Sequence, residues 1–78
     1  MKVKQTEQKE IGRIKLGDTQ DLVVSIVDDE KVDLRIFLNT DSYKGPTKRG
    51  VRFYLFDDNW TEFKKLIDQV DKAYEEIG

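Results

Sequence analysis

Cationic and aromatic side chains lie close together in residues 45–56, where the sequence is GPTKRGVRFYLF. A Gly-Pro pair introduces two adjacent cations, Lys48 and Arg49, and Arg52 follows shortly before Tyr54. Cations neutralise phosphates and aromatic rings stack on bases, so this combination is typical of surfaces that bind single-stranded nucleic acids. The simpler interpretation is an edge strand with solubilising charges. The choice between the two depends on the elements that position these side chains.

The composition indicates one small domain without covalent or metal support. The chain has 78 residues with no cysteine and no histidine, which excludes disulfides and the commonest zinc ligands. A core this small usually needs support from a partner chain. The sequence shows neither an apolar run of about 20 residues nor a signal-peptide pattern. We therefore expect no metal, no cofactor and no membrane contact, and a location in the cytoplasm or nucleoid, or in the nucleus if the host is eukaryotic.

The net charge of −2 hides an uneven distribution. Residues 1–56 carry 11 Lys and Arg against 9 Asp and Glu, which gives +2, whereas residues 57–78 carry 3 against 7, which gives −4. The acidic excess is thus confined to the last segment, and the first segment suits a polyanionic partner. Three consecutive acids at 28–30 are interpreted as a solvated turn rather than a metal site. No nucleophile–base pair stands out, so we expect no catalytic residues and no enzymatic activity.

Hydrophobic periodicity predicts four strands and one helix, an α+β fold with the order ββββα. Residues 1–10 are polar and aperiodic and are expected to form a flexible tail before a domain at 11–78. The last strand follows a loop that contains Pro46, the only proline. Alternation of apolar residues predicts the strands at 11–16, 22–27, 32–38 and about 50–56.

The strongest periodic signal is an amphipathic helix at 60–77, where apolar residues recur in steps of three and four. Asn59 and Glu62 have the spacing of a capping box at its start, and Gly78 is typical of its end. The apolar stripe is wider than one small sheet covers. We therefore expect the helix to pack on its own sheet with one flank and on a second copy, in a homodimer, with the other. The expected dimer contacts are Trp60, Phe63, Ile67, Val70, Tyr74 and Ile77.

With the helix against one face of a curved antiparallel sheet, alternation predicts which side chains occupy the opposite face. Three strands place cations there against a lone acid, Asp33. A solvated sheet face ordinarily mixes both signs, so this excess, together with the rings, favours a single-stranded nucleic acid. No basic helix is available for the groove of a duplex. The candidate binding residues are Arg13, Lys15, Arg35, Phe37, Tyr43, Lys44, Lys48, Arg49, Arg52 and Tyr54.

The chain also resembles the core domain of the positive cofactor four family, which includes a eukaryotic transcriptional coactivator. The similar segments are IGRI (11–14), VDLRIF (32–37), TKRGVRF (47–53) and the helix that opens with Trp60. The resemblance extends over about residues 10–77 and is to the bacterial or viral type of member. It implies a dimer joined through the helices and curved sheets that bind single-stranded DNA with little sequence preference, in transcription, replication or repair. The DNA contacts that it implies are at Arg35, Phe37, Lys48 and Arg49.

Three questions stay open at the level of sequence. Leu38 stands where the coactivator has a tryptophan, so one stacking ring of the family is replaced by an aliphatic side chain. The second question is whether the bound single strand is DNA or RNA. A different class of function is a dimeric protein-interaction module, a regulator or subunit whose sheet face docks an acidic partner. Stacking distinguishes these classes, because an acidic peptide needs the cations but not the rings.

Overall fold

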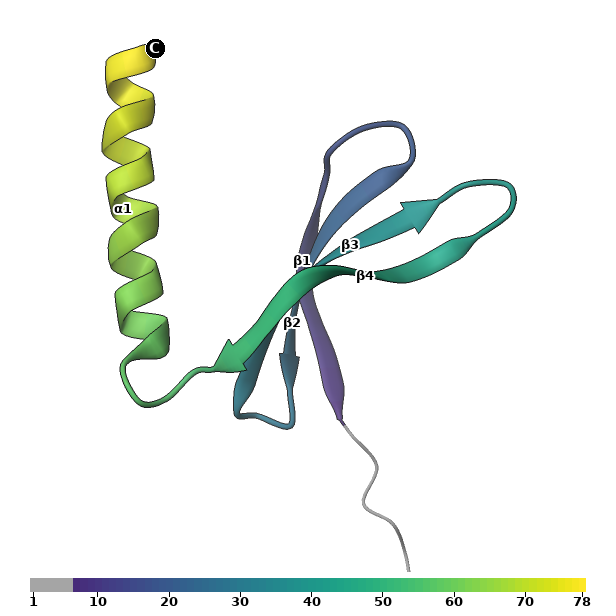
Figure 1. The fold of residues 1–78 in the computed structure, drawn as a ribbon, viewed down its shortest axis with the longest axis horizontal. Coiled ribbons are helices and arrows are strands. Elements are labelled where there is room, and N and C mark those ends of the chain that lie inside the picture. Colours follow the sequence, from purple (N-terminus) through teal and green to yellow (C-terminus); the bar gives the residue numbers. More distant parts are fainter. Residues whose placement is uncertain (1–6) are drawn as a thin grey trace, which may run out of the picture.

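The protein folds into a four-stranded antiparallel sheet followed by a single helix (Figure 1). The computed structural model describes residues 7–78. Each strand pairs antiparallel with the next, so the order in space is the order in the chain, β1-β2-β3-β4. The predicted ββββα layout, an α+β fold, is confirmed. The elements are β1 (Gln8–Lys15), β2 (Gln20–Val27), β3 (Lys31–Asn39), β4 (Lys44–Tyr54) and α1 (Asn59–Ile77).

All four strands begin earlier than the periodicity predicted, and the difference is largest for β1 and β4. β1 starts at Gln8, which pairs with Val27, so the end of the predicted tail is strand; residues 1–6 of that tail lie outside the described residues. β4 starts at Lys44 and includes Pro46, which the sequence placed in a loop. Proline is tolerated there because β4 is an edge strand, where a missing N–H breaks the fewest ladder bonds. Both extensions add side chains to the face that carries the predicted cations.

The most deeply buried side chains belong to the two inner strands. Val23, Val27 and Val32 form the small apolar core. Ser25 and Asp33 are also buried, on the same face of the sheet as Val23 and Val27, and Asp33 is only 1% exposed. A buried carboxylate is unfavourable unless it is paired and hydrogen-bonded, so the partners of Asp33 are central to the structure of this face.

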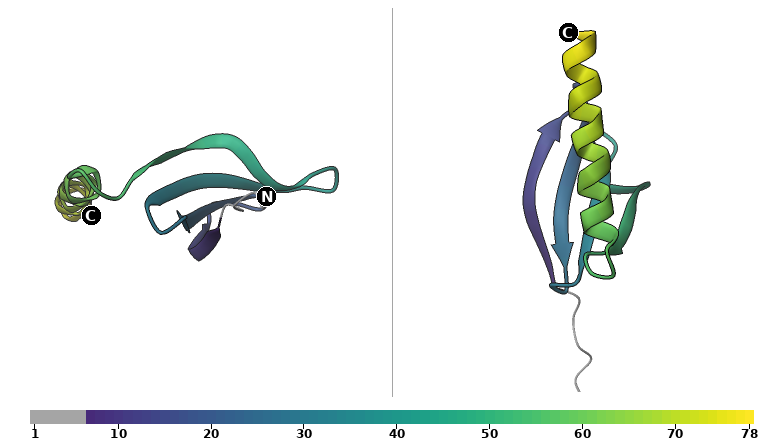
Figure 2. Two further views of the ribbon diagram at one scale, coloured as in Figure 1. Left: turned by 90° about the horizontal axis from the view of Figure 1, so that it is seen from below. Right: turned by 90° about the vertical axis from the view of Figure 1, so that its left-hand side faces the viewer.

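The helix does not cover the sheet, and the prediction that one flank of α1 packs on its own sheet is wrong. Within the described residues α1 contacts only β4, where the rings of Phe53 and Phe63 meet edge to face at 5.5 Å between centroids. Beyond that point α1 extends away from the sheet (Figure 1, Figure 2). The cause is the short connection at 55–58, in which Asp57 and Asp58 adopt positive φ angles of 59° and 68° and turn the chain outward.

The predicted capping box at the start of the helix is also wrong. Asn59 is already helical, and the N-cap residue is Asp58, whose side chain makes no capping hydrogen bond. The side chain of Glu62 instead pairs with a lysine on the next turn. The other end follows the prediction, because the N–H of Gly78 donates to the carbonyl of Tyr74 at 2.9 Å.

Two apolar surfaces are consequently open to solvent. One is the stripe of α1, where Val70, Tyr74 and Ile77 are largely exposed. The other is one side of the sheet, where Ile14 and Val51 are also more exposed than buried. We call this side the apolar face, and its residues are Ile14, Leu22, Val24, Ile26, Val32, Leu34, Ile36, Val51 and Phe53. In the described part of the chain, α1 lacks the long apolar run that a membrane-spanning helix would need.

Candidate nucleic-acid interface

An open groove of about 910 Å³ lies on the sheet face opposite the apolar face. All four strands contribute to this sheet groove, and the turn before β4 adds Tyr43. It occupies the face on which strand alternation predicted the cations. The groove is lined by Gln8, Glu10, Ser25, Asp33, Arg35, Phe37, Tyr43, Pro46, Thr47, Lys48 and Arg52.

The strand register explains why these side chains meet. Ser25 stands opposite Asp33 and Asp33 opposite Arg52, so the three form a row across the inner strands and β4. In the next row Arg35 lies between Val23 on β2 and Gly50 on β4. Residues directly opposite in antiparallel strands share a face of the sheet. The register therefore brings two of the predicted cations, Arg35 and Arg52, to the same side as the buried carboxylate.

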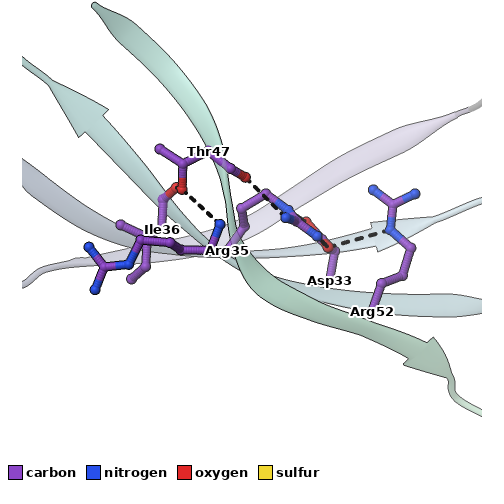
Figure 3. A network of polar contacts seen from close by, with 6 residues as sticks. Asp33, Arg35, Ile36, Thr47 and Arg52 are labelled. Atoms are coloured by element: carbon purple, nitrogen blue, oxygen red, sulfur yellow. Dashed lines mark hydrogen bonds and ion pairs between the residues drawn. The ribbon is translucent and has the colours of Figure 1, made fainter.

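Asp33 is the centre of an ion-pair network with two arginines (Figure 3). Nη2 of Arg35 donates to Oδ1 of Asp33 at 2.7 Å, and Nε of Arg35 lies 3.2 and 3.1 Å from the two carboxylate oxygens. Nε of Arg52 reaches Oδ1 from β4 at 3.4 Å. Burial alone would raise the pKa of Asp33, but the hydrogen bonds and charges of the arginines outweigh it and hold that pKa below its usual value. The carboxylate is therefore ionised at neutral pH.

The side-chain hydrogen bonds of Arg35 are all made to other groups of the protein. In addition to Asp33, its Nη1 donates to the carbonyl of Thr47 at 3.0 Å, and the side chain is only 19% exposed. The hydrogen bond with Asp33 raises the pKa of Arg35. Each of its three guanidinium nitrogens thus has an acceptor within the sheet, and Arg35 joins β3 to β4.

β4 is irregular at the position of the basic pair. Arg35 pairs with Gly50 and Phe37 pairs with Pro46. One residue of β3 lies between these positions, whereas residues 47–49 lie between them on β4. β4 therefore carries two more residues than a regular ladder requires, and Lys48 and Arg49 belong to this bulged segment.

Local hydrogen bonds and one glycine hold the bulged segment. The hydroxyl of Thr47 donates to the carbonyl of Ile36 at 2.7 Å and accepts from the backbone N–H of Arg49 at 3.1 Å. At Gly50 a Cβ atom would lie 2.4 Å from the carbonyl oxygen of Leu34, closer than atoms can approach. The absence of a side chain at Gly50 thus lets β4 rejoin β3 immediately after the basic pair.

One end of the groove is aromatic. Phe37 and Tyr43 line it together with Pro46. The hydroxyl of Tyr43 donates to the carbonyl of Pro46, which fixes the orientation of its ring. The guanidinium of Arg13 lies 5.5 Å from the centroid of the Phe37 ring, a cation–π contact.

The prediction that Asp33 is a lone acid on this face is wrong, because Glu10 and Asp21 share the face. Both pair with Arg13, Glu10 through contacts of 2.9 and 2.6 Å and Asp21 at 3.3 Å. The hydrogen bonds between Arg13 and Glu10 lower the pKa of Glu10 and raise that of Arg13. Glu10 escaped the prediction because β1 begins before its expected start, and part of the predicted cation excess is therefore neutralised.

The groove brings together only part of the predicted binding set. Tyr54 lies toward the helix end of β4, where Nζ of Lys31 is 5.2 Å from the centroid of its ring. The predicted residues that line the groove are Arg35, Phe37, Tyr43, Lys48 and Arg52. Those that lie outside its lining, all exposed, are Arg13, Lys15, Lys44, Arg49 and Tyr54.

Sequence reasoning missed several lining residues for different reasons. Gln8 and Glu10 fall in the segment predicted as tail. Ser25 did carry a signal, because it is the polar residue in LVVSIV and alternates with Val24 and Ile26 of the apolar face. Thr47 carried no such signal, because its contacts depend on the bulged segment of β4 and no periodic pattern predicts that irregularity.

Within residues 7–78 no three His, Cys, Asp or Glu side chains are grouped so that they could hold a metal ion. Comparisons with protein-family models, with curated proteins and with solved structures gave no match to this chain. Its function must therefore be inferred from the residues and geometry of the groove.

Proposed function

We propose that the protein binds single-stranded DNA along the sheet groove with little sequence preference, in support of transcription, replication or repair. The observation that carries the proposal is that Lys48 and Arg52 line one open groove with two rings, Phe37 and Tyr43. Cations neutralise the backbone phosphates, and rings stack on any base because every base has a π-face. The resemblance to the positive cofactor four family favours the same function.

The charge of the helix argues against a duplex as the ligand. α1 carries five acidic and three basic side chains, so it would be repelled by the phosphates that border a major groove. The sheet groove instead suits a flexible strand whose bases can turn toward the rings. A single strand thus fits the cations and the rings together.

We also propose that the protein forms a homodimer through α1 and the apolar face. The connection at 55–58 directs α1 away from its own sheet, which leaves both the helix stripe and the apolar face open. Exposed apolar surfaces of this kind are typical of interfaces. A second copy offers a matching stripe and a matching sheet face, so each α1 can pack on the partner's sheet and helix around a two-fold axis.

Fluorescence anisotropy with a labelled oligo-dT tests the binding proposal. If Lys48, Arg52 and one neighbouring cation of each protomer contact phosphates, about six cations per dimer take part, and the slope of log K against log salt is roughly −4. Affinity should then fall roughly 300-fold between 50 mM and 200 mM salt. A duplex and an RNA of equal length are the controls, and the duplex should bind more weakly.

Three outcomes separate the alternatives. Equal affinity for duplex and single strand, or an affinity that salt does not change, contradicts the proposal. Tighter binding of the RNA identifies RNA as the preferred strand. An acidic peptide that binds well, and still binds after Phe37 and Tyr43 are replaced by alanine, favours the protein-interaction module.

A further inference from the structure

Arg35 and Arg52 share the carboxylate of Asp33 but leave different atoms free. Arg35 directs Nε and Nη2 to Asp33 and Nη1 to the Thr47 carbonyl. Arg52 uses only Nε, at 3.4 Å, and its side chain is 40% exposed. Figure 3 shows Nε of Arg52 joined to Asp33, while its two terminal nitrogens lie beyond Nε with no interaction drawn to them. Within residues 7–78 these nitrogens make no hydrogen bond to another side chain or to the backbone.

The free edge of Arg52 has the geometry that binds phosphate. Two parallel N–H groups of a guanidinium match two oxygens of a phosphate, which a lysine ammonium cannot do. The contact at Nε, a long hydrogen bond of 3.4 Å, restrains the plane of the guanidinium and with it the direction of the opposite edge. Asp33 itself is held by Arg35, which is anchored in turn to β4. The chain of contacts ends at Arg52, which lines the groove.

We infer that Arg52 is the phosphate-binding fork of the sheet groove, that Asp33 is its positioning residue, and that Arg35 serves mainly to anchor Asp33. This inference rests on the proposed binding of single strands and divides the work among the groove's charged residues. If the inference holds, the acidic side chain of Asp33 strengthens the binding of a polyanion. Charge alone predicts the opposite, because a carboxylate in the groove repels phosphates.

The decisive measurement is the sign of the effect of Asp33→Ala on oligo-dT affinity. This replacement removes one negative charge per protomer, so charge alone would tighten binding. Positioning predicts weaker binding, by about fivefold, because the bidentate contact of Arg52 loses its fixed orientation. When Arg52 has already been replaced by Gln, Asp33→Ala should tighten binding. Asp33 then has no guanidinium to position, and its removal only reduces the repulsion of phosphates. Tighter binding of Asp33→Ala in the otherwise unchanged protein would overturn the inference.

A second variant keeps the test valid if Asp33→Ala does not fold. Arg52→Lys retains the positive charge but replaces the two-nitrogen edge with one ammonium group. It should keep the wild-type salt slope and still lose most of the affinity that Arg52→Gln loses. Arg52→Gln should also flatten the slope by about 0.7 per lost contact. If Arg52→Lys binds oligo-dT as tightly as the unchanged protein, Arg52 acts through charge alone and the inference fails.

Side-chain NMR with inorganic pyrophosphate distinguishes failure of this inference from failure of the proposed function. Pyrophosphate should shift the Nε–H resonance of Arg52 and leave that of Arg35 nearly unmoved, and Asp33→Ala should reduce the Arg52 shift. If oligo-dT does not bind but these shifts appear, the proposed function fails and the phosphate fork stands. A larger shift at Arg35 than at Arg52 would overturn the assignment of the fork.

Discussion

The guanidinium of Arg13 lies over the ring of Phe37, 5.5 Å from its centroid, and covers one side of that ring. Glu10 and Asp21 hold Arg13 in this position through ion pairs of 2.6 and 3.3 Å. Phe37 lines the groove whereas Arg13 does not. A base that stacks on Phe37 would therefore have to use the other side of the ring.

Replacing Phe37 with alanine should weaken oligo-dT binding by about 1–3 kcal/mol and leave the salt slope nearly unchanged, because a stacked base releases no counterion. Tyr43→Ala should have an effect of the same kind. Tyr54→Ala is the matched control, since Tyr54 lies outside the groove lining and should contribute less. Anisotropy at several salt concentrations measures both quantities. Wild-type affinity in a Phe37→Ala variant that is folded by circular dichroism would show that the ring serves packing.

Arg35→Gln should lower the free energy of unfolding by about 3 kcal/mol, the lower end of the cost of breaking a buried ion pair, because Arg52 still faces Asp33. Arg49→Gln, at an exposed position in the bulged segment of β4, should change the free energy of unfolding by less than about 0.5 kcal/mol. Urea unfolding at equal protein concentrations gives both values. Similar losses for the two variants would mean that Arg35 has no structural role.

Acidification should destabilise the fold through Asp33. Its pKa in the folded protein is depressed, so the contribution of its ionised form to stability is complete above the ordinary aspartate value of about 3.9 and is lost as the pH falls through the folded pKa. The urea concentration at the midpoint of unfolding should therefore decrease as the pH is lowered below about 4. Asp33→Asn should be less stable at neutral pH but show a smaller decline with acid. An equal decline in both proteins would locate the acid sensitivity elsewhere.

Val70→Asp should convert the proposed homodimer to a monomer. The replacement places an unpaired charge in the apolar contact of α1, at a cost of several kcal/mol. Thr61→Asp is the control, because Thr61 lies nine residues earlier, about two and a half turns, and therefore on the opposite side of the helix. Sedimentation at tens of micromolar distinguishes the two states. An unchanged protein that sediments as a monomer would refute the dimer.

Regular alternation made much of the sheet predictable. In β3 every second residue from Val32 onward is apolar, while Asp33, Arg35 and Phe37 alternate with these residues, and the pairing of the strands follows this division. The assignment of Arg35 and Phe37 to one face needed only the two-residue period of a strand. For the same reason alternation placed Arg13, Arg35 and Arg52 on one face correctly, although it missed the acidic side chains of Glu10 and Asp21 there.

Features without a period were not predictable in the same way. The direction of α1 depends on the positive φ angles of Asp57 and Asp58, a local backbone choice that composition does not specify. The internal use of Arg35 depends on how near the Thr47 carbonyl comes. The position of Pro46 within a strand depends on β4 being at the edge of the sheet. Each of these follows from tertiary geometry rather than from local pattern.

The two additional residues in β4 make the basic pair separable from the ladder that carries it. If Lys48 and Arg49 were removed, Thr47 would precede Gly50 directly, and β4 would match β3 residue for residue between the flanking pairs. The sheet can thus gain or lose these cations by insertion or deletion without a change in its apolar residues. The two cations can therefore change independently of the apolar residues. Proteins with this sheet can differ widely in affinity for polyanions while they keep the same core.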